Sequence, residues 1–127
     1  MIVAGVGCRR DTSAEEVERV VRLALGMFRL APERLDAMAT ETDKALESGL
    51  VEAARLLSVR LVACTVSDLD RVAGEVLTPS LLVLATKGVP SIAEASALVV
   101  AGRNARLLGT RVATERATCA IAIGDGR

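Results

Sequence analysis

The chain has 127 residues, 51% of them hydrophobic, and its 16 basic residues balance 16 acidic ones. A chain of this length can bury one core, so we expect a single domain over residues 1–127. No apolar run approaches the roughly 20 residues that a bilayer crossing needs, and the start of the sequence has no signal-peptide pattern. The composition therefore predicts a cytoplasmic protein that does not contact a membrane.

Other classes of protein are excluded by residue counts. The net charge is zero, and the chain has one Phe and no Tyr or Trp, so neither a general positive field nor base stacking favours a nucleic-acid partner. The absence of histidine excludes a hydrolase triad with a His base. Three widely spaced cysteines suggest neither a disulfide framework nor a zinc site. We predict no metal and no cofactor.

The apolar pattern predicts strands and helices in alternation. A first strand is expected at 2–6, and apolar residues at helical spacing after Ser13 predict a helix over 14–30. Ser13 and Glu16 form the S-x-x-E pattern typical of a helix start, and Pro32 ends this helix. The later predicted elements are a strand at 35–40, a helix at 45–57, a strand at 61–65, a short helix at 67–73, a strand at 81–86, a helix at 91–101, and two hairpin strands at 105–113 and 117–123.

This alternation predicts a three-layer α/β/α sandwich with a mixed, mostly parallel sheet. A hydroxyl residue followed three positions later by an acid recurs at the predicted helix starts. The four pairs are Ser13/Glu16, Thr40/Asp43, Ser67/Asp70 and Ser91/Glu94. Because each pair follows a predicted strand, parallel strands would gather all four helix starts at one carboxyl edge of the sheet, where open α/β sheets bind ligands.

The first loop, Gly5 to Ser13, has the features of an anion site. Gly5 and Gly7 would let the backbone approach a ligand closely, the following helix start offers free amides, and Arg9 and Arg10 add charge. The loop lacks the third glycine of a dinucleotide fingerprint and the Gly-Lys-Ser/Thr ending of a phosphate loop. A generic nucleotide binder is therefore kept only as an alternative.

Basic residues stand in several of the loops expected at this edge. Arg9, Arg10, Lys44 and Lys87 would give a neutral protein a local positive rim, which favours a polyanionic ligand with carboxylate groups. The alternative is that these residues are solubilising loop charges. The arginines near the end of the chain are predicted to be solvated: Arg103, Arg106, Arg111 and Arg116.

Three residues are candidates for catalysis. Cys8 lies next to two arginines at a helix start, an environment that lowers a thiol pKa, although a packing role is the alternative. Lys44 and Glu47 are three residues apart, so Glu47 could orient the lysine or act as an acid or base, or the two could form an ordinary ion pair. Cys64 and Cys119 are predicted to be core residues.

Motifs along nearly the whole chain resemble the family formed by the cobalamin biosynthesis protein CobE and the C-terminal domain of CbiG. The matching pieces are G-x-G-C-R-R at Gly5 to Arg10, T-x-x-x-K-x-x-E-x-G at Thr40 to Gly49, and G-V-x-S-I-A-E-x-x-A at Gly88 to Ala97. The resemblance implies a three-layer α/β domain acting in corrin-ring assembly. This chain has Asp11 where relatives often have glycine.

The resemblance also implies the ligand class, because precorrins carry acetate and propionate side chains around an apolar macrocycle. We therefore expect a protein of aerobic cobalamin synthesis that binds a precorrin or corrinoid intermediate. Two alternatives stay open: an enzyme acting on a precorrin through Cys8 or Lys44/Glu47, and a module that delivers intermediates to other cobalamin-pathway enzymes. The expected ligand-binding residues are Gly5, Gly7, Cys8, Arg9, Arg10, Ser13, Thr40, Lys44, Lys87, Gly88, Ser91 and Glu94.

Overall fold

The computed structural model describes residues 1–75 and 91–126. The strands in these residues are β1 (Ile2–Cys8), β2 (Ala37–Glu41), β3 (Arg60–Cys64), β4 (Arg106–Leu107), β5 (Val112–Ala113) and β6 (Ala117–Ile123). The α-helices are α1 (Ala14–Met27), α2 (Ser48–Leu56), α3 (Val66–Arg71) and α5 (Ile92–Ala101). Short 3-10 helices occupy η1 (Pro32–Arg34), η2 (Thr42–Lys44) and η3 (Ala73–Glu75).

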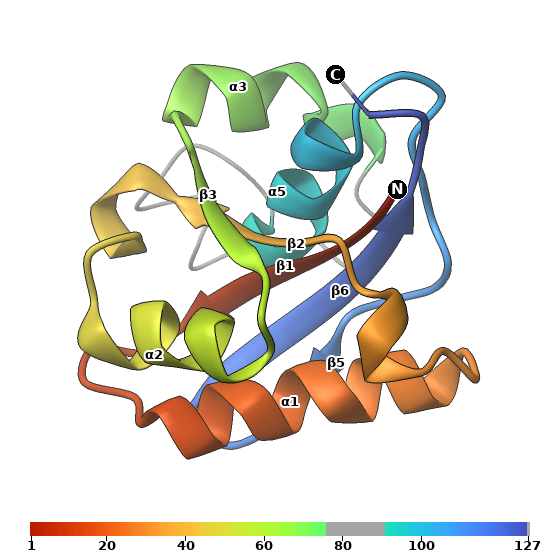
Figure 1. Ribbon diagram of the computed structural model, residues 1–127. Coiled ribbons are helices and arrows are strands. Elements are labelled where there is room, and N and C mark those ends of the chain that lie inside the picture. Colours follow the sequence, from red (N-terminus) through yellow and green to blue (C-terminus); the bar gives the residue numbers. More distant parts are fainter. Residues whose placement is uncertain (76–90, 127) are drawn as a thin grey trace.

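The strands form one mixed, partly parallel sheet, with the order β3-β2-β1-β6-β4 and β5 also paired to β6. β1, β2 and β3 run parallel, whereas β6 is antiparallel to β1 along its whole length. The arrowheads of β1 and β2 therefore point to the same side of the molecule in Figure 1. This side is the carboxyl edge at which we expect the ligand to bind.

Two apolar clusters lie on opposite faces of the sheet and make three layers. One cluster joins α1 and α2 to one face, through residues such as Val17, Leu25 and Leu50. The other joins α3 and α5 to the opposite face, through residues such as Leu69 and Leu98. Figure 1 shows α1 and α2 below the sheet and α3 and α5 above it. The predicted α/β sandwich is confirmed. No helix in the described ranges is both long and apolar enough to cross a membrane.

Helix α5 packs against the sheet at backbone distance. A Cβ atom at Gly5 would lie 1.9 Å from the carbonyl oxygen of Ala93 and 2.7 Å from the amide nitrogen of Ala97. Small residues on β6, including Ala120 and Ala122, keep the same face flat and are fully or nearly fully buried. Gly5 was expected to admit a ligand, but the space beside it is filled by helix α5.

Two helices end earlier than their apolar pattern predicts. α1 stops at Met27 instead of residue 30, because Arg29 adopts a left-handed φ of 57°. The amide of Leu30 then donates to the carbonyl of Leu25 at 3.0 Å, which closes the helix in a Schellman motif. α2 ends in the same way before Ser58, with φ of 58°. Because Arg29 and Ser58 adopt this conformation in place of a glycine, the sequence gives little indication of where the two helices end.

Two of the four expected helix caps are confirmed. The hydroxyls of Ser13 and Ser91 accept from the amides three residues later, at 3.1 and 3.4 Å. The prediction for Thr40 is wrong, because Thr40 lies inside β2 and its buried hydroxyl donates to the carbonyl of Val6 at 2.8 Å. The prediction for Ser67 is also wrong, because the capping box of α3 starts two residues earlier, at Thr65.

The segment predicted as a strand at 105–113 consists of two short strands with a bend between them. A Cβ atom at Gly109 would lie 2.8 Å from the ring of Phe28, so the bend packs tightly against the end of α1. β4 and β5 nevertheless both pair with β6 in the antiparallel sense that the predicted hairpin requires. The predicted strand at 81–86 lies outside the described residues.

Candidate functional site at the carboxyl edge

Helix starts from distant parts of the chain meet at the carboxyl edge of the parallel strands. α1, η2 and α3 follow β1, β2 and β3 directly. The start of α5 lies beside β1, since a Cβ atom at Gly7 would be 3.7 Å from Cβ of Ile92. The expected convergence is therefore present, although the starts after β2 and β3 differ from those predicted.

The loop after β1 is fixed by hydrogen bonds on both sides. The amide of Arg9 donates to the carbonyl of Arg116 at 2.9 Å, and the hydroxyl of Thr12 donates to the carbonyl of Arg9 at 2.6 Å. Asp11 adopts a φ of 62°, in the left-handed region that glycine occupies without strain. A glycine at position 11 would adopt this conformation without strain. The side chains of Arg9 and Arg10 are exposed.

Glu47 joins this loop to η2. Its Oε1 accepts from the amide of Asp11 at 2.8 Å, and its Oε2 lies 2.9 Å from Nζ of Lys44. These two contacts, the Lys44 contact first, lower the pKa of the Glu47 carboxyl group. Glu47 is therefore ionised at neutral pH. An ionised carboxylate with both oxygens engaged is poorly suited to act as a general acid.

An open basin of about 610 Å³ lies where these loops meet. Its lining consists of Arg10, Asp11, Asp43, Lys44 and Glu47. Two cations and three acids share this surface, so the basin is less positive than the sequence predicts. The correction has a physical reason, because the same acids that shape the loops also partner their cations, as Glu47 does for Lys44.

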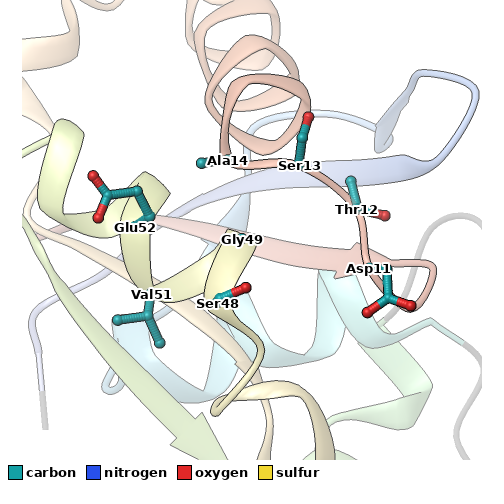
Figure 2. A pocket seen from close by; sticks show the side chains of 8 residues that line it. All are labelled: Asp11, Thr12, Ser13, Ala14, Ser48, Gly49, Val51 and Glu52. Atoms are coloured by element: carbon teal, nitrogen blue, oxygen red, sulfur yellow. The ribbon is translucent and has the colours of Figure 1, made fainter.

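A second hollow, of about 570 Å³, is lined by residues from the starts of both α1 and α2 (Figure 2). Figure 2 labels Thr12 in the loop before α1 and Gly49 in the first turn of α2, both of which line this hollow. A Cβ atom at Gly49 would lie only 2.0 Å from the carbonyl oxygen of Thr12, so this contact requires glycine. The contact holds α2 close enough for Glu47, the residue before α2, to reach Asp11.

Arg116 belongs to this edge, although the sequence predicts it to be solvated. One of its guanidinium nitrogens donates to the carbonyl of Arg10 at 2.7 Å, and the side chain is exposed. The antiparallel pairing of β1 with β6 brings the two residues together, since Cys8 faces Ala117 across the ladder. In the sequence, the only indication that Arg116 lies at this edge is its place in the turn at 114–116, directly before the last strand.

Other predicted ligand residues are buried or form hydrogen bonds within the fold. Thr40, Ser91 and Glu94 are fully buried, and Ser13 and Ser91 use their hydroxyls as helix caps. Gly7 is half-buried, and its carbonyl accepts from the hydroxyl of Thr118 at 3.3 Å. Lys87 and Gly88 lie outside the described residues.

The prediction that nearby arginines lower the pKa of Cys8 is wrong. Cys8 is half-buried at the end of β1, and burial together with the Glu47 carboxylate raises the pKa of its thiol. Lys44, Thr12 and Arg116 oppose this shift and are outweighed. The three catalytic candidates do lie near one another, but Cys8 is a protonated thiol at neutral pH. Cys64 and Cys119 are buried, as predicted.

We expect Cys8 to react with iodoacetamide only as the pH rises above the range in which an ordinary thiol ionises. Its raised pKa means that the thiolate fraction at pH 8 is below that of free cysteine. Peptide mass spectrometry of the alkylated protein over pH 7 to 10 gives the rate of Cys8 alkylation, and the midpoint is the pH at which this rate reaches half its maximum. Glu47→Gln removes a negative charge and should lower that midpoint. A midpoint below that of free cysteine would contradict the prediction.

Within residues 1–75 and 91–126, no group of three or more His, Cys, Asp or Glu side chains could hold a metal ion.

Comparisons with known proteins show the family to which the chain belongs. The family described as "Cobalamin synthesis G C-terminus" matches residues 2–122. The chain belongs to this family of cobalamin biosynthesis proteins. It is 35% identical to protein CobE of Sinorhizobium sp over 121 residues, which cover 95% of this chain and 79% of that protein. The resemblance stated from the sequence motifs is confirmed.

Solved structures of this family share the fold. A CobE protein of the cobalamin biosynthetic pathway superimposes with a TM-score of 0.93 at 34% identity, covering 100% of this chain and 92% of the other. The cobalamin biosynthesis protein chiG from Agrobacterium tumefaciens gives 0.78 at 36% identity, covering 98% and 99%.

A longer relative is matched only in part. The chain is 28% identical to the cobalt-precorrin-5A hydrolase of Priestia megaterium over 102 residues, which cover 80% of this chain and 27% of that enzyme.

Proposed function

We propose that this protein binds a polycarboxylate precorrin or corrinoid intermediate of the aerobic cobalamin pathway at the carboxyl edge of its sheet. The likeness to CobE proteins, which covers 79% of one and 92% of the other, supports this assignment. The likeness to the hydrolase covers only a quarter of that enzyme and supports no catalytic step.

The observation that carries the proposal is the junction made by Glu47. Its contacts with the amide of Asp11 and with Nζ of Lys44 join the loop after β1 to the turn after β2. Arg10 and Lys44 therefore face one basin, although 34 positions (44 − 10) separate them in the sequence. Arg116 adds a third cation from the last hairpin.

Cations placed in this way suit a ligand with several separate acid groups. Arginine can present two donors to one carboxylate, whereas lysine offers an adjustable point charge. The acids of the basin limit its overall field, so recognition depends on individual cations meeting individual carboxylates. Lys44 can exchange its contact with Glu47 for a ligand carboxylate, because both side chains keep about a fifth of their surface exposed (22% and 21%).

The test is a titration of the purified protein with hydrogenobyrinic acid, followed by the visible absorbance of the ligand. We expect a spectral shift that weakens with added salt, and a roughly 10- to 100-fold weaker affinity for the Arg9→Ala/Arg10→Ala variant, because a hydrogen bond between charged groups contributes about 1.5–3 kcal/mol. Since both arginines are exposed, folding should be unaffected.

The matched control is Arg103→Ala/Arg106→Ala, which removes the same charge from the opposite edge of the sheet, where Arg106 pairs with Ile123. This variant should bind like the original protein. An equal loss of affinity in both variants would show attraction by net charge alone. An unchanged spectrum at every ligand concentration would reject the proposal.

The catalytic alternative receives less support from the site. It requires a thiolate at Cys8 or a proton-donating Glu47, and the pKa of each is shifted in the unfavourable direction. Neither shift affects a binding role.

A further inference from the structure

We propose that Leu46 is an apolar contact of the same site and packs against the hydrocarbon macrocycle of the ligand while the nearby cations hold its carboxylates. This inference rests on the proposed function and adds a residue that no motif of the sequence singled out. Leu46 stands between Lys44 and Glu47, both of which line the basin.

The exposure of Leu46 is unusual in this molecule. Its surface is 92% exposed, whereas the other exposed large apolar side chains in the described ranges lie between 43% and 69%. A leucine left in water gives up the free energy that burial of its side chain would supply. Such a residue is most useful when a partner molecule covers it.

The backbone that carries Leu46 is held in place. The amide of Ala45 donates to the carbonyl of Thr42 at 3.3 Å, and the amide of Glu47 donates to the carbonyl of Lys44 at 3.0 Å. The Glu47 side chain fixes the turn to the neighbouring loop. The backbone carbonyl of Glu47 accepts from the amide of Val51 at 3.1 Å. Leu46 is thus presented to solvent by a fixed turn.

The surroundings favour a small amphipathic ligand over a second copy of the chain. A stable interface between proteins buries about 1,200–2,000 Å² and has an apolar centre depleted in charges. Leu46 is instead a single exposed leucine in the stretch of chain that contains Asp43, Lys44 and Glu47, which line the basin. An exposed apolar side chain in the same turn as charged basin residues matches a molecule that has an apolar ring and an acidic periphery.

The test compares Leu46→Ser with Leu56→Ser, in which an exposed leucine at the far end of α2 is changed in the same way. Hydrogenobyrinic acid should bind roughly 10-fold more weakly to Leu46→Ser, because the variant loses an apolar side chain that the bound ligand would cover. Its affinity for Leu56→Ser should not change. Citrate, which has carboxylates but no ring, should bind both variants as it binds the original protein.

Each outcome separates this inference from the proposed function. Equal affinity of Leu46→Ser and the original protein for hydrogenobyrinic acid overturns the role of Leu46 and leaves the proposed function standing. No binding to the original protein overturns both. Sedimentation that shows a dimer dissociated by Leu46→Ser assigns Leu46 to a contact between copies and also overturns the inference.

Discussion

Replacement of Gly5 by Ala should lower the free energy of unfolding by about 3 kcal/mol. The new methyl group would lie 1.9 Å from the carbonyl oxygen of Ala93 and 2.7 Å from the amide nitrogen of Ala97. Both are backbone atoms of α5, so no side chain can rotate away, and the helix must move from the sheet. Because α5 covers β1, β2 and β6, the movement loosens one whole layer.

The measurement is chemical denaturation followed by circular dichroism, since a chain with one Phe and no Tyr or Trp has little intrinsic fluorescence. Gly26→Ala is the matched control, because no atom lies within 4 Å of a Cβ at that helical position. Alanine is the better helix former, so this variant should gain about 0.5–1 kcal/mol. If Gly5→Ala is as stable as Gly26→Ala, the close packing of α5 on β1 is refuted.

Replacement of Gly49 by Ala should disturb both stability and the candidate site. Its methyl group would lie 2.0 Å from the carbonyl oxygen of Thr12, again a backbone atom. α2 must then move away from the loop after β1, which separates Glu47 from the amide of Asp11. We expect a loss of about 2 kcal/mol in the free energy of unfolding and at least a 10-fold weaker affinity for hydrogenobyrinic acid.

Gly74→Ala serves as the control, because its Cβ would meet no atom within 4 Å and it lies in η3, on the other face of the sheet. The affinity of Gly74→Ala should match that of the original protein. A Gly49→Ala variant that loses stability but binds with full affinity would show that the Glu47 junction does not organise the site.

Much of the fold could be predicted because its signals are local. The apolar spacing after Ser13 places α1 correctly at its start, and the β6 segment matches its predicted bounds. The ends of helices were harder, because Arg29 and Ser58 adopt left-handed conformations that glycine or asparagine would have marked. The cap of α3 was misplaced because Thr65 and Ser67 both precede an acid at the correct spacing.

The candidate site was predictable in location but not in charge. Parallel strands bring their carboxyl ends together, so the loops with Arg10 and Lys44 had to meet. The effect of the Glu47 carboxylate on the pKa of Cys8 and the hydrogen bond from Arg116 to the carbonyl of Arg10 depend on which atoms approach one another in space. Spacing along the chain does not contain that information.

The sequence by itself determined the alternation of strands and helices, the family, and the edge at which the loops gather, because each follows from periodicity, turn residues or motifs read along the chain. Only the tertiary structure decided that Gly5 makes room for the backbone of helix α5, that Glu47 joins two loops, and that burial raises the pKa of Cys8. The physical reason is that close contacts, ion pairs and desolvation act between residues distant in sequence, so their strength depends on distances that folding alone sets.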